Sequence, residues 1–328
     1  MKVPTLVAAA AAFAFSVISA LAQPIGTITL YTSQPNDQVA ATLKDFAKTQ
    51  PDVKIEVFRS GTTEIMNKLQ AEAAAGAPKA DVLLLADEIS MMRIKAAGLL
   101  LPYPDAPTAD LPASIVDQQK SFFGTRLITS GIVYNTKLVA NPPKSWSDLL
   151  TPDVASKTIL PSPLYSGAAV MNVGTIVQQP QLGWKFYETL AANGAVATNA
   201  NGAVVEAVAR GEKAYGIIID YMAMNAKAKG SPVDYVFPTE GVTIMSQPVA
   251  IVKTTKNLEA ARAFADWQLS EAAQKAAVAQ GYFPALPSVQ PPAGYPAVSA
   301  IKVLPVDLDM LLSQDEANKQ KFSEIFGG

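Results

Sequence analysis

Residues 25–98 alternate apolar runs with amphipathic segments and read IGTITLYTSQPNDQVAATLKDFAKTQPDVKIEVFRSGTTEIMNKLQAEAAAGAPKADVLLLADEISMMRIKAAG. The first two runs alternate apolar and polar side chains, as strands do, and the third is continuously apolar, as in a strand buried on both faces. The other segments repeat apolar residues at helical spacing, and glycine follows the last two. This βαβαβα order predicts a parallel sheet with right-handed crossovers. The predicted strands are 25–31, 53–58 and 80–85, and the predicted helices are 38–47, 62–75 and 88–97.

The rest of the chain contains a second α/β unit and then a return segment. Two strands, 126–132 and 242–250, carry Ser or Thr amid apolar residues, and we expect them to cross between two lobes. Open α/β sheets bind ligands at the carboxyl ends of their strands, so we expect the site in the cleft between these lobes. The predicted strands here are 126–134, 158–160, 215–219 and the extended segment 242–252, and the predicted helices are 167–177, 182–192, 203–209, 221–229, 257–270, 271–280 and 304–326.

The N-terminus has the pattern of an export signal. Lys2 supplies a short positive region, residues 3–21 are mostly apolar or small, and Ala20-Leu21-Ala22 fits the small-x-small cleavage rule. An uncleaved membrane anchor is the alternative, because about 19 apolar residues nearly span a bilayer. The run is rich in alanine rather than leucine, so we expect a cleaved signal and a periplasmic protein. The predicted domains are 1–22 for the signal peptide, 23–128 plus 248–300 for lobe 1, 129–247 for lobe 2 and 301–328 for a C-terminal helical tail.

The composition excludes much of enzyme chemistry. The 328 residues include no cysteine and no histidine, which removes thiol nucleophiles, disulfides, zinc–thiolate sites and the commonest general base. The formal net charge of −2 argues against a nucleic-acid partner, because no excess of positive charge is available to neutralise phosphates. Ser299 to Lys302 matches S-x-x-K, but the motifs that accompany it in enzymes are missing. We therefore expect a binding protein without a metal or a cofactor.

Two turns that follow strands and open helices are candidate seats for an oxyanion. The turns at 60–62 and 166–168 combine backbone N–H groups, hydroxyl donors and the positive end of a helix dipole. The small residues at 167 and 168 leave their N–H groups accessible to a ligand. The structural alternative is that Ser or Thr in each turn only caps its helix. The candidate binding residues at these and the first strand end are Ser33, Ser60, Gly61, Thr62, Ser166, Gly167 and Ala168.

Acidic residues also follow strands on the expected cleft side. Asp87 comes after the apolar run 80–85, and Asp220, with Tyr221 beside it, comes after the strand 215–219. Glu240 lies in a turn-like loop. A buried acid is costly unless it is paired, so these groups are candidate contacts for a ligand's ammonium group or hydroxyls. Helix capping and a solvated loop carboxylate are the alternatives, and the sequence leaves both open.

An ordered set of short segments carries a family resemblance. They are Leu30-Tyr-Thr-Ser33, Gly61-Thr-Thr-Glu64, Ala71 to Gly76, Ala80-Asp-Val82, Gly131-Ile-Val-Tyr-Asn135, Pro143 to Leu149, Gly211 to Gly216 and the region 260–280. With these, the chain resembles the type II periplasmic solute-binding proteins of ABC importers, in the branch of ferric-iron, 2-aminoethylphosphonate and sugar-phosphate binders. The resemblance runs from about 28 to 286. It implies an α/β fold of two lobes joined by crossover hinge strands, with a monomer that closes on its ligand and docks on an inner-membrane ABC permease.

The departures from the family pattern bear on the ligand. Iron-binding members resemble one another in having two adjacent tyrosines after the Gly-x-x strand of the second lobe, where this sequence has Asp220-Tyr221-Met222. Ferric iron is therefore disfavoured and remains the alternative within the class. The Ser/Thr/Gly turns suit phosphoryl oxygens, so we expect a small anionic or zwitterionic phosphonate or organophosphate, with 2-aminoethylphosphonate as the first choice. A secreted hydrolase on the same scaffold and a sensor that presents ligand to a receptor are the alternatives from other classes.

Overall fold

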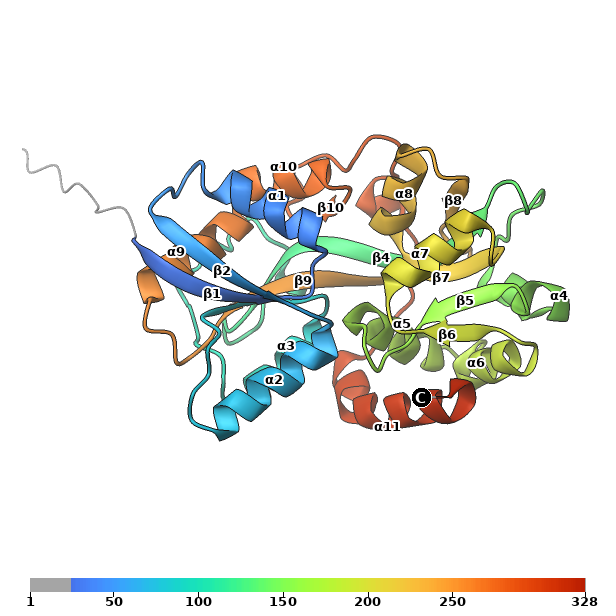
Figure 1. Ribbon diagram of the computed structural model, residues 1–328, viewed down its shortest axis with the longest axis horizontal. Coiled ribbons are helices and arrows are strands. Elements are labelled where there is room, and N and C mark those ends of the chain that lie inside the picture. The colour runs from blue at the N-terminus through green and yellow to red at the C-terminus, as the bar shows by residue number, and fades with distance from the viewer. Residues whose placement is uncertain (1–24, 328) are drawn as a thin grey trace, which may run out of the picture.

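The computed structural model describes residues 25–327. Its centre is a mixed ten-stranded sheet (Figure 1). The order along the sheet is β2-β1-β3-β9-β4-β7-β5-β6, and β8 and β10 pair with β4 outside this path. The predicted signal peptide lies outside the described residues. The strands are β1 (Gly26–Thr32), β2 (Val53–Arg59), β3 (Val82–Leu84), β4 (Phe123–Asn135), β5 (Thr158–Pro161), β6 (Val196–Thr198), β7 (Tyr215–Ile219), β8 (Val233–Val236), β9 (Thr243–Ile251) and β10 (Phe283–Pro284).

The pairing divides the sheet into two parallel halves with an antiparallel centre. In the first half, β1 pairs in parallel with β2 and β3, and in the second half β5 pairs in parallel with β6 and β7. Between the halves, β9 pairs antiparallel with β3 and β4, and β4 pairs antiparallel with β7. The two long strands β4 and β9 run from one half into the other (Figure 1), which confirms the prediction of crossover strands.

The helices cover the faces of both halves. The predicted helices are all present with ends shifted by a few residues, and the segment at 141–150 contains a 3₁₀ turn, Trp146–Leu150, that Ser145 caps. No helix of residues 25–327 combines the length and apolarity that a membrane span requires. The helices are α1 (Asn36–Phe46), α2 (Thr62–Ala74), α3 (Glu88–Ala96), α4 (Pro152–Ala155), α5 (Gly167–Val177), α6 (Gly183–Ala192), α7 (Asn201–Arg210), α8 (Asp220–Ala228), α9 (Leu258–Leu269), α10 (Glu271–Ala279) and α11 (Leu308–Phe326).

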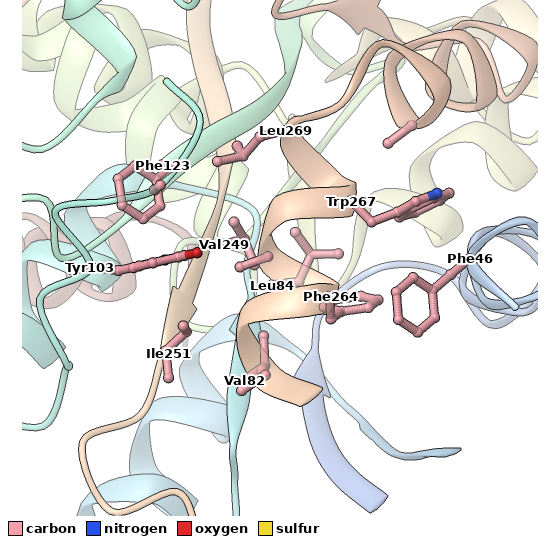
Figure 2. Close-up of a cluster of buried hydrophobic side chains, with 14 of the residues drawn as sticks. Phe46, Val82, Leu84, Tyr103, Phe123, Val249, Ile251, Phe264, Trp267 and Leu269 are labelled. Carbon is pink, nitrogen blue, oxygen red and sulfur yellow. The ribbon is translucent and has the colours of Figure 1, made fainter. Parts of the chain in front are cut away.

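Each half of the sheet has its own hydrophobic core. In the first half, Phe264 and Trp267 of α9 pack edge-on against Phe46 of α1 (Figure 2). Strand residues Val82 and Val249 belong to the same cluster. In the second half, Trp146, Phe186, Tyr187 and Phe322 belong to a separate cluster between the sheet and helices α5, α6 and α11. A third cluster spans the two halves, because Ile89 of α3 packs there together with Val204 of α7 and Ile218 of β7.

The C-terminal helix α11 joins elements of both halves. It packs against α5 and α6 of the second half and against α3, which follows the last strand of the first half. Asp315 of α11 accepts hydrogen bonds from Arg93 of α3 at 2.5 Å and from Lys319 at 2.9 Å. The predicted helix at 304–326 is thus present from Leu308 onwards. It lies below the sheet in the view of Figure 1.

Candidate functional site

A cavity of about 290 Å³ lies where the carboxyl ends of the parallel strands of both halves meet. Ser33 and Ser60 follow β1 and β2 on one side, and Asn199 and Ile219 mark the ends of β6 and β7 on the other. This edge of the sheet is the expected position for a ligand in an open α/β fold. The residues around the central cavity include Ser33, Arg59, Ser60, Gly61, Thr62, Glu64, Ala86, Tyr165, Ser166, Gly167, Ala168, Asn199, Ala200, Asn201, Ile219, Tyr221, Met222 and Gln247.

The first turn of α2 presents donors to the central cavity. Gly61 is the N-cap residue, and it has no side chain with which to satisfy the first N–H groups of the helix. Thr62 is only 2% exposed, and its Oγ1 has no hydrogen-bond partner among the described residues. An unpaired buried hydroxyl costs free energy, so this group is a natural contact for a polar ligand atom. Ser60, by contrast, is already paired, because its hydroxyl donates to Glu64.

The first turn of α5 faces α2 across the central cavity. Ser166 is the N-cap of α5: its Oγ accepts from the Ala169 N–H at 3.2 Å and from Asn201 Nδ2 at 2.9 Å. The Ser166 hydroxyl therefore caps the helix, which was the structural alternative for this residue. The helix dipole and the backbone N–H groups of Gly167 and Ala168 are still available to a ligand, and the N-termini of α2 and α5 converge on the same cavity.

Glycines let the two halves touch beside the central cavity. A Cβ placed on Gly61 would lie 2.9 Å from the Tyr165 carbonyl oxygen of the second half. A Cβ on Gly167 would lie 1.9 Å from Asp87 Oδ2 and 3.0 Å from Thr62 Oγ1, both of the first half. Either approach is closer than a real Cβ contact, so this arrangement of the halves requires glycine at both positions.

Arg59 is the cationic side chain that lines the central cavity. It ends β2, and its Nε donates to the Gln34 carbonyl oxygen at 3.0 Å, which leaves both Nη groups for other partners. A guanidinium recognises phosphate or carboxylate oxygens with two parallel hydrogen bonds. Arg59 was not among the predicted site residues, although its position directly before the turn at 60–62 was a usable signal.

The rest of the cavity wall is amide and aromatic. Sequence reasoning also did not identify Asn199, Asn201 and Gln247, which come from the end of β6, the start of α7 and β9. Tyr221 lines the cavity and packs against Tyr282, with ring centroids 4.3 Å apart and the ring planes tilted by 38°. Burial raises the pKa of Tyr221 well above its ordinary value, so its phenol stays protonated. These groups offer hydrogen bonds and an apolar surface, and the remaining charge on the wall is that of the Glu64 carboxylate.

None of the three predicted acids lines the central cavity. Asp220 is fully buried, and its carboxylate accepts from Thr129 N at 3.0 Å, Thr129 Oγ1 at 2.8 Å and the Tyr221 N–H at 2.7 Å. Glu240 accepts from Ser145 Oγ at 2.6 Å and from the Trp146 N–H at 3.3 Å. The structure therefore gives both carboxylates partners within the protein.

Asp87 lies behind the cavity wall rather than in it. It is the N-cap of α3, where its carboxylate accepts from the Ser90 N–H at 2.7 Å and from the Ser90 hydroxyl at 2.9 Å. Its Oδ2 atom also approaches Gly167 of the second half. Glu64 is the carboxylate that does line the cavity. Among residues 25–327, no group of three or more acidic side chains is gathered in a way that would hold a metal ion.

Comparisons with known proteins agree with this fold. The family model for bacterial extracellular solute-binding proteins matches residues 32–275. A probable ABC transporter periplasmic-binding protein of Sinorhizobium fredii is 28% identical, over 98% of this chain and 91% of that protein. The periplasmic binding protein AfuA of Actinobacillus pleuropneumoniae, solved with fructose-6-phosphate bound, is 21% identical with a TM-score of 0.84, over 92% and 98% of the two chains. Iron-bound HitA of Pseudomonas aeruginosa is 22% identical with a TM-score of 0.80, over 91% and 99%.

Proposed function

The chain belongs to the family of bacterial extracellular solute-binding proteins, and we propose that it captures a small organic phosphate or phosphonate in the central cavity. The fold is that of the type II periplasmic binding proteins. We further propose that it acts in the periplasm and delivers its ligand to an inner-membrane ABC permease, as the name of the Sinorhizobium relative suggests for that protein. The proposed lobes are 23–128 plus 248–300 and 129–247, with β4 and β9 as the hinge strands.

The observation that carries this proposal is the convergence of α2, α5 and Arg59 on one cavity. Two helix N-termini supply N–H donors and partial positive charge, and the guanidinium supplies a full positive charge. Thr62 is one of the residues that line this cavity, and its buried hydroxyl lacks a partner among the described residues. A tetrahedral oxyanion satisfies all of these groups at once. At about 290 Å³, the cavity suits a ligand below drug size.

The remainder of the ligand is best explained as neutral and hydroxylated. Asn199, Asn201 and Gln247 offer amide groups, which hydrogen-bond to hydroxyls. An ammonium group, as in 2-aminoethylphosphonate, would need a carboxylate partner in the cavity. Glu64 is the carboxylate that lines the cavity, because Asp220 and Glu240 bind other groups of the protein. The geometry thus supports a phosphate ester such as a sugar phosphate more strongly than an aminophosphonate. AfuA, which was solved with fructose-6-phosphate, has a similar fold.

Ferric iron is the second candidate, because the iron-bound HitA has a similar fold. Iron needs several anionic oxygen ligands, and the cavity offers Glu64 and the phenols of Tyr165 and Tyr221. The burial that keeps the Tyr221 phenol protonated opposes its use as a phenolate ligand. A hydrolase on this scaffold would be revealed by turnover of a chromogenic phosphate ester.

The test is a thermal-shift screen followed by titration calorimetry on Arg59→Gln. We expect fructose 6-phosphate to stabilise the protein by about 2.7 kcal/mol at 100 times its dissociation constant. Loss of the guanidinium removes a charge-assisted interaction worth about 1.5–3 kcal/mol, so affinity falls on the order of 10- to 100-fold. The screen also contains 2-aminoethylphosphonate, ethylphosphonate and ferric citrate.

Arg210→Gln is the matched control, because Arg210 is exposed on α7 and pairs with Glu206 at 2.7 Å. We expect this variant to bind as the wild type does. Glu64→Gln distinguishes fructose 6-phosphate from 2-aminoethylphosphonate as the ligand. It weakens the binding of 2-aminoethylphosphonate if the carboxylate holds an ammonium group. Stabilisation by ferric citrate alone, or equal affinity in the wild type and in Arg59→Gln, contradicts the proposal.

A further inference from the structure

Asp87 places a carboxylate directly behind the proposed oxyanion seat. The side chain is fully buried, and its Oδ2 lies 1.9 Å from where a Cβ of Gly167 would stand. Thr62, a residue of the cavity lining, has its Oγ1 at 3.0 Å from the same point. Both positions belong to the first turns of the helices that form the seat. A carboxylate at this place repels an anion in the cavity, and buried charges are poorly screened by salt.

The groups around Asp87 do not neutralise it. Ser90 of α3 supplies two hydrogen bonds, and Thr62 of α2 and Gly167 of α5 bring no charge. The next residue, Glu88, is a second buried carboxyl, whose Oε1 accepts from the Ser246 N–H of β9 at 2.5 Å. From α11, Asp315 opposes a negative charge on Asp87 and Lys319 favours it. Arg93 and Lys319 are themselves engaged with Asp315 and Glu316.

We propose that Asp87 takes up one proton when the oxyanion binds, so that the anion faces a neutral carboxylic acid. This inference rests on the proposed function. The proton comes from solvent and resides on the carboxyl group, and no bond of the ligand changes. Ser90 Oγ, 2.9 Å from Oδ2, acts as donor to the carboxylate and as acceptor from the acid, so both forms keep a hydrogen bond. Asp87 is in this sense a positioning residue that makes anion capture sensitive to pH.

The direction of the pH dependence follows from the change in the pKa of Asp87. Burial, which is the largest cause, raises this pKa from its ordinary value of 3.8 to about 6 in the protein without ligand. A bound anion nearby raises it further, because a like charge disfavours ionisation. Affinity therefore increases as the pH falls from the pKa of the complex toward about 6 and levels off below it. The gain approaches tenfold per pH unit, which is the limit for one proton.

The experiment compares the affinities of the wild type and of Asp87→Asn for methyl phosphate between pH 5.5 and 8, using titration calorimetry. The second ionisation of methyl phosphate affects both proteins equally, so the difference between the two profiles isolates Asp87. Asparagine keeps an oxygen that can accept from the Ser90 N–H and carries no charge. We expect the wild type to lose affinity relative to Asp87→Asn as the pH rises above 6, by several-fold to tenfold at pH 7.5.

Two controls keep the proposal falsifiable. Asp266→Asn removes a partly buried acid of α9 whose pKa burial also raises but which does not line the central cavity, and this variant is expected to retain the wild-type pH profile. Titrations of the wild type in two buffers with different ionisation heats give the number of protons taken up on binding. This measurement does not depend on whether any variant folds. Parallel profiles of the wild type and Asp87→Asn, or no proton uptake beyond that of methyl phosphate itself, overturn this inference while the proposed function stands. Absence of methyl phosphate binding at every pH overturns the inference together with the phosphate seat.

Discussion

Gly167 is the residue at which the two halves approach most tightly behind the central cavity. An added Cβ would lie 1.9 Å from Asp87 Oδ2, and Asp87 is fully buried and held by Ser90, so it has little room to move. We expect Gly167→Ala to lower the affinity for fructose 6-phosphate on the order of 10- to 100-fold, because overpacking of this kind costs about 1–3 kcal/mol. Titration calorimetry measures the loss. The comparison variant is Gly202→Ala on the same cavity wall, where a Cβ meets no atom within 4 Å, and its loss should be much smaller. Equal losses would show that the contact with Asp87 is unimportant.

Helix α11 shows how one element joins the two halves through buried charge. Asp315 is 3% exposed, and Lys319 beside it is 9% exposed, whereas the side chain of Glu316 in the same cluster is 71% exposed. We expect Asp315→Ala to lower the free energy of unfolding by about 3 kcal/mol, since it leaves the buried Lys319 without its nearest carboxylate, at 2.9 Å. Glu316→Ala should cost less than about 1 kcal/mol, because an exposed ion pair contributes little. Chemical denaturation checks both, and similar losses would mean that burial of the cluster does not matter.

At the scale of the whole molecule, we expect the two halves to close about β4 and β9. The turn at Gly61 touches Tyr165 across the cavity, which describes a closed arrangement of the halves. We expect the free protein to sample an open form and ligand to select the closed one, because the donors of α2 and α5 meet a single anion only when the halves are together. Small-angle scattering should therefore give a smaller radius of gyration with fructose 6-phosphate than without it. An unchanged radius, at a concentration where calorimetry shows binding, would argue for a rigid site.

The candidate site was predictable where it depends on the start of a helix. The turns at 60–62 and 166–168 combine small and hydroxyl residues directly before apolar helical periodicity, and the structure brings both to the central cavity. The acids were not predictable in the same way. The carboxylates of Asp87 and Glu240 accept hydrogen bonds from the backbone N–H groups of Ser90 and Trp146. Whether an acid binds the backbone or a ligand depends on tertiary packing, which a local sequence pattern does not predict.

The sequence by itself determined the alternation of strands and helices, since side-chain periodicity and capping act over a few residues. It also excluded thiol and imidazole chemistry, because those side chains are missing. Only the tertiary structure decided which polar groups share a cavity. Arg59, Asn201 and Gln247 come from positions far apart in the chain. They meet because β2 ends, α7 begins and β9 crosses at the same edge of the sheet. Contacts between residues so distant in sequence depend on how the sheet is assembled, and the sequence pattern around each residue is the same whichever strands become neighbours.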